Sequence, residues 1–140
     1  MNINEFKNIF NNCEIVGEKI VVKSDIAKVI DFIKNNYGFD MLEDITAIDN
    51  QDKGIELIYR LYSSENDETV LISATAEKEI ESVSKIFDSA VADEKEIYDL
   101  FGINFIGNEE QERLYMPENW QGHPLRKDYE ENDERLKWNE

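Results

Sequence analysis

Residues 55–63 carry the pattern that most narrows the possible folds, because apolar and polar side chains alternate along them. One face of the expected strand holds Ile55, Leu57, Tyr59 and Leu61. The other face holds Glu56, Arg60 and Tyr62. Since the side chains of a strand point alternately to its two faces, this strand has one buried side and one solvated side. Such one-sided burial is typical of antiparallel sheets.

Further segments of β-like composition supply the partners of this strand. They are residues 13–23, which turn at Gly17 and Glu18, residues 42–49, residues 69–76 and, as a short strand or extended segment, part of residues 102–107. Turns are predicted at residues 50–54 and at Asn66 and Asp67, where turn-forming residues gather. The central part of the chain therefore predicts a meander of strands.

The most regular helical pattern lies in residues 26–37. Its apolar stripe consists of Ile26, Val29, Ile30, Ile33 and Tyr37. These positions recur at helical spacing and so face one side of a helix. Ser24 is expected to cap its N-terminus, and Gly38 can end it in a left-handed conformation. A shorter helix is expected at the start of the chain, from Ile3, Phe6 and Phe10.

Two more helices are predicted in the second half of the chain. One has an apolar stripe of Ile80, Val83, Phe87 and Ala90 and would lie on the same sheet face as the helix at residues 26–37. The other is expected to be capped by Asp93, with Glu96 reaching back as in a capping box and Glu94 adding favourable charge. Its apolar face consists of Ile97, Tyr98 and Phe101, and Gly102 ends it.

These elements predict an α+β fold of two layers, in which helices pack on one face of a mainly antiparallel or mixed sheet. At 140 residues the chain has the size of one domain. We expect this domain to span residues 1–129 and to include an extended C-terminal segment. Residues 130–140 are expected to form an acidic tail.

The chain is strongly acidic, with a formal net charge of -17 and 34% charged residues. Such a surface repels nucleic-acid phosphates and anionic lipids, whereas a basic protein surface would attract it. The acidity can equally serve solubility alone. The longest uncharged stretch covers residues 100–108, far fewer than the roughly 20 apolar residues of a membrane-spanning helix. No secretory signal is visible either, so a cytoplasmic location is expected.

Candidate ligands for metals or redox groups are few. Cys13 is the single cysteine and His123 the single histidine. One thiolate cannot hold an iron-sulfur cluster, and the apolar neighbours of Cys13 predict a small buried thiol. A dyad of Cys13 and His123 would lie in no known nucleophile motif. We therefore expect no catalytic residue, no metal site and no cofactor; the alternative is a stand-alone protein that binds a divalent metal through carboxylates and His123.

Residues 122–129 form a loop whose shape is set by its own sequence. Gly122 permits unusual backbone angles, and Pro124 fixes its own φ and extends the residue before it. A preorganised loop loses less entropy on binding, and this one presents two adjacent basic residues in an acidic chain. The residues expected to contact a partner are Arg113, Trp120, His123, Arg126, Lys127 and Asp128. The alternative is that Arg126 and Lys127 only neutralise acids of their own chain.

Two blocks of sequence together resemble a known family. They are EKEIYDLFGINF at residues 94–105 and RLYMPENWQGHPLRKDY at residues 113–129. In this order and at this spacing they are similar to the signature of the 30 kDa (C-type) subunit family of respiratory complex I, which also includes small subunits of energy-converting nickel-iron hydrogenases. Besides the contact residues above, the match is carried by Glu94, Glu96, Tyr98, Asp99, Phe101, Gly102, Gly122, Pro124 and Leu125.

The resemblance implies a mixed α/β domain that holds no redox centre of its own. It also implies packing against the large hydrogenase-like subunit of the 49 kDa type, beside neighbouring iron-sulfur subunits, on the cytoplasmic face of the cell membrane. The expected function is that of a non-catalytic docking subunit of a complex-I-like NADH:quinone oxidoreductase, in electron transfer coupled to ion translocation. One alternative is the small subunit of a membrane-bound nickel-iron hydrogenase, and another is a cytosolic adaptor unrelated to energy conversion.

Some positions depart from the family pattern. Val91 and Ala92 stand near a frequent aromatic residue, and Asn108 and Glu109 stand where His and Pro are frequent. Glu130 replaces the usual proline. These differences leave the family resemblance intact, but they blur which of the related complexes the chain would join.

Overall fold

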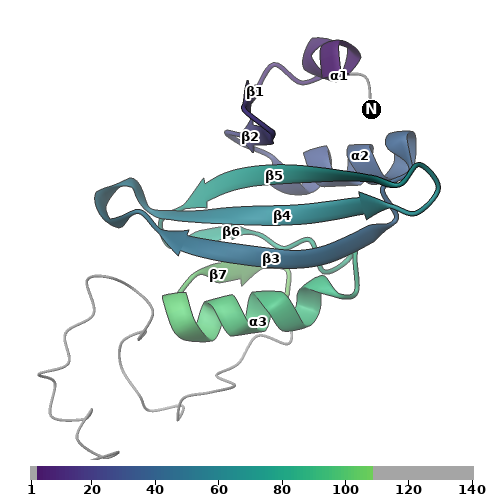
Figure 1. Cartoon of the computed structure of the whole chain (residues 1–140). Helices are drawn as coiled ribbons and strands as arrows, with labels where there is room; N and C mark the ends of the chain where they lie inside the picture. Colours follow the sequence, from purple (N-terminus) through teal and green to yellow (C-terminus); the bar gives the residue numbers. More distant parts are fainter. Residues whose placement is uncertain (1–2, 109–140) are drawn as a thin grey trace, which may run out of the picture.

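The structure is a computed structural model that describes residues 3–108 of the 140-residue chain. Its helices are α1 (Ile3–Ile9), α2 (Ile26–Tyr37), the short 3-10 helix η1 (Gln51–Lys53) and α3 (Ala90–Phe101). Its strands are β1 (Cys13–Val16), β2 (Lys19–Val22), β3 (Met41–Asp49), β4 (Ile55–Ser63), β5 (Glu68–Ala76), β6 (Glu79–Glu81) and β7 (Asn104–Ile106). Helices and a mixed sheet share one domain in this range, which confirms the predicted α+β class (Figure 1).

The main sheet has the strand order β1-β2-β5-β4-β3. β3, β4 and β5 pair antiparallel, with Tyr59 of β4 opposite Ile45 of β3 and Ile72 of β5. β1 and β2 form an antiparallel hairpin, and β2 pairs parallel with β5. β4 runs from Ile55 to Ser63, the range that its alternating sequence predicts. One face of the strand is buried and the other is not, which explains the alternation.

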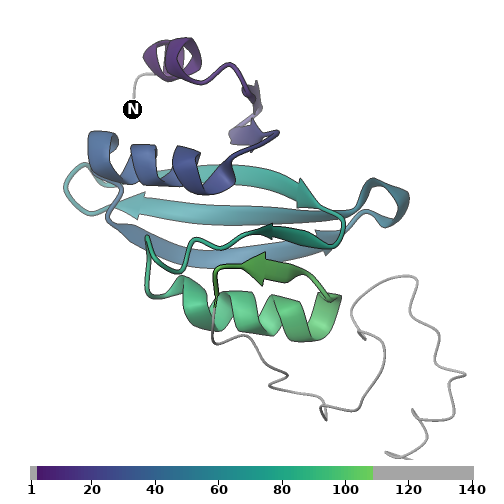
Figure 2. The same ribbon diagram turned by 180° about the vertical axis from the view of Figure 1, so that it is seen from behind.

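The helices cover one face of this sheet, as the alternation along β4 requires. The residues of β4 on that face, Ile55, Leu57, Tyr59 and Leu61, are all 0% exposed. α2 lies across this face in Figure 2 and buries Ile26, Val29, Ile30 and Ile33. α3 packs against β3, with Ile97 buried in the same core. Each such side chain stabilises the fold by about 1.5–3 kcal/mol, so the two-layer packing is the main source of stability.

The two ends of α2 are formed in different ways. Gly38 has a φ of 73°, so the helix ends in the predicted left-handed conformation. The prediction that Ser24 caps the N-terminus is wrong, because the cap position belongs to Asp25, which has a φ of 57° and makes no side-chain capping bond. Ser24 instead bonds to Asn12, whose side-chain amide donates to the carbonyl oxygen of Ser24 at 2.6 Å.

The predicted helix through Ile80, Val83, Phe87 and Ala90 does not form. Ile80 lies in β6, which pairs parallel with β7, and Ile80 is opposite Phe105. Val83 and Phe87 are buried, but they lie in the turns between β6 and α3. Apolar residues three or four positions apart can face a core from turns as well as from a helix. Here the residues around Ile80 form a strand because β6 pairs with β7.

Helix α3 begins four residues earlier than predicted. It starts at Ala90, so Asp93 lies within its first turn and is not the cap. Ser89 precedes the helix, and its hydroxyl donates to the carbonyl oxygen of Leu42 at 3.0 Å, which ties the start of α3 to β3. Gly102 ends the helix with a φ of 80°, as predicted. Among the described helices, none has the length and apolar character needed to cross a membrane.

Candidate functional site

The residues expected to contact a partner all lie outside residues 3–108. This holds for Arg113, Trp120, His123, Arg126, Lys127 and Asp128, and for the motif residues Gly122, Pro124 and Leu125. The other motif residues lie on α3 or at its end: Glu94, Glu96, Tyr98, Asp99, Phe101 and Gly102. The structure therefore describes the first block of the family signature, and the second block stays a prediction.

The centre of the first block is Glu94, a fully buried carboxylate (0% exposed). Its Oε1 accepts hydrogen bonds from the Ser82 hydroxyl at 2.6 Å and from the Asn108 side-chain amide at 3.0 Å. Its Oε2 accepts one from the backbone N–H of Val83 at 2.9 Å. Glu94 thus joins three separate parts of the chain: helix α3, the turn after β6 and the residues after β7. We call Glu94, Ser82, Val83 and Asn108 the Glu94 cluster.

Burial raises the pKa of Glu94 above its ordinary value of 4.5, although the three hydrogen bonds oppose this shift. The neighbouring charge of Asp93 adds to the rise. A buried carboxylate is costly unless it is hydrogen-bonded, and here three donors reduce that cost. The sequence predicts for Glu94 only a favourable charge at the helix start, so its burial and its partners are findings of the structure.

Tyr59 is a second buried polar group near this cluster. Burial raises the pKa of its phenol, and the charges of Glu94 and Glu81 raise it further. Its hydroxyl is buried and has no hydrogen-bond partner within residues 3–108.

The remaining motif residues of α3 support the fold. Asp99 is 0% exposed, and Phe101 and Tyr98 pack against the core. The backbone N–H of Gly102 donates to the carbonyl oxygen of Tyr98 at 3.0 Å and closes the helix end. The sequence of this block can be explained by a helix with an apolar face that ends at Gly102. The positions of these residues on α3 agree with that explanation.

A shallow hollow of about 260 Å³ lies between β3 and α3. Its apolar lining is Ile45, Ala47, Ile97, Leu100 and Phe101, with Thr46 at the strand. Asp93 and Glu96 add two carboxylates. Burial raises the pKa of Asp93, against a hydrogen bond from the backbone of Ile45 that lowers it. Glu96 is an exposed residue at the rim of this hollow and does not form the predicted capping box.

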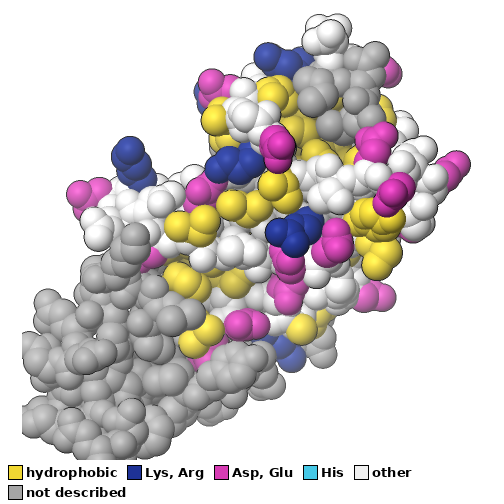
Figure 3. All heavy atoms as spheres, viewed as in Figure 1, with side chains coloured by type: hydrophobic (Ala, Val, Ile, Leu, Met, Phe, Trp, Pro, Cys, Tyr) yellow, Lys and Arg dark blue, Asp and Glu magenta, His cyan; other side chains and the backbone are white. Residues whose placement is uncertain are grey.

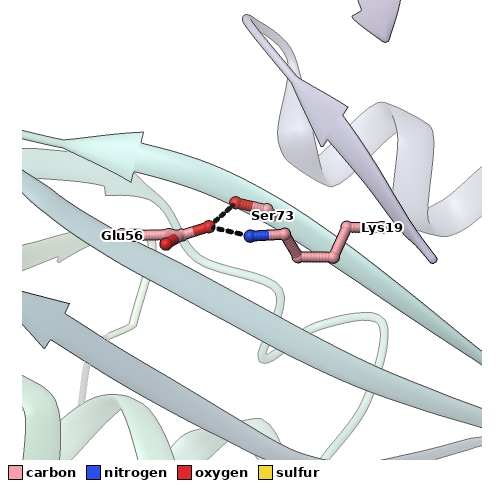
Figure 4. A network of polar contacts seen from close by, with 3 residues as sticks. All are labelled: Lys19, Glu56 and Ser73. Atoms are coloured by element: carbon pink, nitrogen blue, oxygen red, sulfur yellow. Dashed lines mark hydrogen bonds and ion pairs between the residues drawn. The ribbon is translucent and has the colours of Figure 1, made fainter. Parts of the chain in front are cut away.

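The second face of the main sheet carries a polar network at its centre. The carboxylate of Glu56 accepts hydrogen bonds from the Lys19 ammonium at 2.8 Å and from the Ser73 hydroxyl at 2.6 Å (Figure 4). These bonds lower the pKa of Glu56. The network joins β2, β5 and β4, so it supports the parallel pairing of β2 with β5. Apolar side chains form separate patches among charged groups in the view of Figure 3.

The described residues provide little for chemistry. Within residues 3–108, no group of three or more His, Cys, Asp or Glu side chains is placed to hold a metal ion. Cys13 is buried, as predicted, and burial raises the pKa of its thiol to about 11. A thiol in that state is a poor nucleophile and metal ligand at neutral pH. His123, its suggested partner, lies outside the described residues.

Sequence reasoning misses Ser82 and Asn108, the two side chains that donate to Glu94. Both are distant from Glu94 in sequence, and Asn108 stands out only as a departure from the family pattern. Asn108 comes after Gly107, which follows β7, and this position in the sequence does not indicate that its side chain turns inward. No local indication exists for Ser82 either.

Comparison with known proteins gives consistent matches. The sequence profile of a family described as "Respiratory-chain NADH dehydrogenase, 30 Kd subunit" matches residues 20–135. A protein of Trichlorobacter lovleyi, named as the C subunit of NADH-quinone oxidoreductase, is 39% identical over 115 residues, which cover 78% of this chain and 71% of that relative. A protein of the same name from Moorella thermoacetica is 29% identical over 136 residues, which cover 91% of this chain and 92% of the relative.

A third relative combines two subunits of that oxidoreductase in its name. The protein of Phocaeicola vulgatus, named as the C/D subunit of NADH-quinone oxidoreductase, is 36% identical over 97 residues. The match covers 66% of this chain and 19% of that relative. The part of the relative that resembles this chain is therefore a small share of a much longer protein.

Proposed function

Since the chain belongs to the family of the 30 kDa subunit of respiratory-chain NADH dehydrogenase, we propose that it is the non-catalytic docking subunit of such a complex. The single observation that carries this proposal is the extent of the family match, residues 20–135. That range contains most of the described residues, 20–108, and the segment from Arg113 to Asp128 that is expected to contact a partner. Relatives that cover most of the chain are named as the C subunit of NADH-quinone oxidoreductase, which favours this complex over a hydrogenase.

The proposed partner is a subunit of the D type, the large hydrogenase-like subunit. Support comes from the C/D relative of Phocaeicola vulgatus, in which this chain matches only 19% of the polypeptide. Two subunits that are joined in one chain are held close together. We therefore expect this chain and a separate D-type subunit to be neighbours. The proposed surroundings also include iron-sulfur subunits beside the D-type subunit, on the cytoplasmic face of the membrane.

The proposed contact is electrostatic and preorganised. Arg126 and Lys127 follow Pro124 closely in a chain with a net charge of -17. They therefore place two adjacent positive charges on an otherwise acidic molecule. Planar guanidinium groups suit paired hydrogen bonds with carboxylates of a partner. In this proposal the domain continues to residue 129, and residues 130–140 are a tail that takes no part in the contact.

Reversing the two basic charges should weaken docking without unfolding the domain. We expect the variant Arg126→Glu with Lys127→Glu to co-purify with the D-type subunit of the same organism about tenfold less efficiently, because truncating or reversing contact charges costs at least about 1.4 kcal/mol. The thermal unfolding midpoint of the purified chain should stay unchanged. Co-expression, affinity purification and quantification of both subunits provide the measurement.

A matched control separates a local contact from a general charge effect. Lys23→Glu with Lys28→Glu changes the net charge by the same amount at two exposed positions of the described domain. This control should co-purify like the unmodified chain. Equal retention of the D-type subunit by all three proteins would remove the proposal for this segment.

A further inference from the structure

Within the described residues, β3 is an edge strand of the main sheet, and helix α3 runs beside it (Figure 1). An edge strand offers backbone N–H and C=O groups that no neighbouring strand pairs. The start of α3 occupies two of these groups. The Ser89 hydroxyl donates to the carbonyl oxygen of Leu42 at 3.0 Å, and the Asp93 carboxylate accepts a hydrogen bond from the backbone of Ile45. The first half of the β3 edge is therefore covered by α3.

The second half of this edge borders the hollow between β3 and α3. Thr46 and Ala47 line the hollow from the strand, and Ile97 and Leu100 line it from the helix. Successive residues of a strand present their backbone groups to opposite edges, so the groups of Ala47 face the same edge as those of Ile45. An extended segment of another polypeptide can pair with an edge of this kind.

The size and the walls of the hollow indicate what kind of group fits it. Its volume of about 260 Å³ lies below the roughly 300–1,000 Å³ of sites for small molecules, so one long side chain fits it better than a metabolite. The walls at Ala47, Ile97 and Leu100 are apolar. Lys and Arg bury their methylene stems along apolar surface and keep the charged end near water.

Carboxylates lie where the charged end of such a side chain would come. Asp93 and Glu96 both line the hollow. Burial raises the pKa of Asp93, and the charges of Glu96 and Asp44 raise it further, so the three carboxylates are close enough to repel one another. Asp44 is paired with Arg60 at 3.6 Å, but Asp93 and Glu96 have no ion-pair partner within residues 3–108. A cation in the hollow would relieve this repulsion.

We propose that the hollow between β3 and α3 is a docking site for a lysine or arginine side chain, carried on an extended segment of the D-type subunit. The inference rests on the proposed docking function. It adds a second contact, whose charge is opposite to that of Arg126 and Lys127. A second copy of this chain is a poor occupant, because each copy has a net charge of -17 and like charges repel.

Removing the two charges without changing the shape of the hollow tests the proposal. We expect the full chain with Asp93→Asn and Glu96→Gln to bind the purified D-type subunit about tenfold more weakly, and with a smaller dependence on salt. The unfolding midpoint at pH 7 should not fall, because asparagine keeps an acceptor for the backbone of Ile45 and the repulsion is removed. Carboxylates that only supported the fold would lose stability together with binding.

Glu14→Gln with Glu18→Gln is the matched control. It removes the same number of charges at two exposed positions, on β1 and in the turn that follows it. β1 lies at the opposite edge of the main sheet from β3. This control should bind the D-type subunit like the unmodified chain.

Each other result has a definite meaning. If the variant at Asp93 and Glu96 binds like the unmodified chain while the charge reversal at Arg126 and Lys127 weakens binding, the hollow is not a contact and the docking function stands. Equal weakening by the control would assign the effect to net charge and overturn the proposal. A lower unfolding midpoint would indicate a basic side chain of the same chain in the hollow, and loss of a dimer would indicate a second copy; both overturn it. If neither variant weakens binding, the docking function falls as well.

Discussion

Glu94→Ala should lower the free energy of unfolding by about 3 kcal/mol. The substitution removes the acceptor of three hydrogen bonds at a site with no exposed surface. The Val83 N–H would be left without this acceptor, and a buried donor that loses its acceptor is costly. Chemical denaturation of the full chain, followed by circular dichroism, measures the change.

The variant Glu94→Gln tests the charge separately from the shape. Because burial raises the pKa of Glu94 above 4.5, the folded chain holds a proton there at pH values at which the unfolded chain has lost it. The contribution of Glu94 to stability therefore falls as the pH rises through the range above 4.5. Glutamine does not titrate, so the stability of the unmodified chain relative to Glu94→Gln should decrease over this range.

The lowered pKa of Glu56, on the other face of the sheet, does not disturb this comparison. The pKa of Glu56 is lowered, so its contribution is lost on acidification, but it is present in both proteins and cancels in the difference. A relative stability that rises with pH would show that the pKa of Glu94 is lowered in the folded state. A loss below about 1 kcal/mol for Glu94→Ala would show that the Glu94 cluster does not hold α3, the turn after β6 and Asn108 together.

Gly54→Ala should also be strongly destabilising, with an expected cost of about 3 kcal/mol. Gly54 has a φ of 90° and a ψ of -165°, a region that residues with a Cβ essentially avoid. A Cβ there would also lie 2.9 Å from the carbonyl oxygen of Ala76 and 3.1 Å from Cγ2 of Thr75. Because β5 is paired along its length with β4, the backbone of Ala76 cannot move away easily.

Gly17→Ala is the matched control for this prediction. Gly17 also has a positive φ, 60°, but a Cβ there would have no atom within 4 Å. Its expected cost is about 1 kcal/mol, from the left-handed conformation alone. Thermal or urea unfolding of both variants measures the difference between them. Equal costs would mean that the close approach to Ala76 is relieved without loss of stability.

Local patterns in the sequence predict the elements whose burial follows from their own spacing. The alternation at residues 55–63 matches β4, and the apolar stripe at residues 26–37 matches α2. Gly38 and Gly102 end their helices as expected, because a left-handed residue requires little beyond its own lack of a Cβ. For these elements the sequence alone is sufficient.

The errors arise where a distant partner decides the local structure. Ile80 and Val83 have helical spacing, but pairing of β6 with β7 makes Ile80 part of a strand. Nothing near Ser24 indicates that Asn12 binds it, so the predicted cap of α2 lies one residue too early. The parallel pairing of β2 with β5 joins residues distant in sequence, such as Ile20 and Ile72, and no local pattern encodes such a pairing.

The sequence likewise predicts only part of the candidate site. The family signature identifies Glu94 and Asp99 as important residues, but it does not indicate that both are fully buried. Burial assigns them to the support of the domain. Contact of the second block of the signature with a partner remains a proposal. The partners of Glu94 become visible only when the fold brings Ser82 and Asn108 to it.

We propose that this chain works by attachment to a larger redox subunit and performs no redox chemistry itself. Affinity isolation of the full chain from native membranes, with the co-isolated proteins quantified by mass spectrometry, tests it most directly. We expect recovery of the D-type and iron-sulfur subunits in amounts close to that of the chain. Recovery of the chain without them, with a bound redox group or turnover of its own, would contradict it.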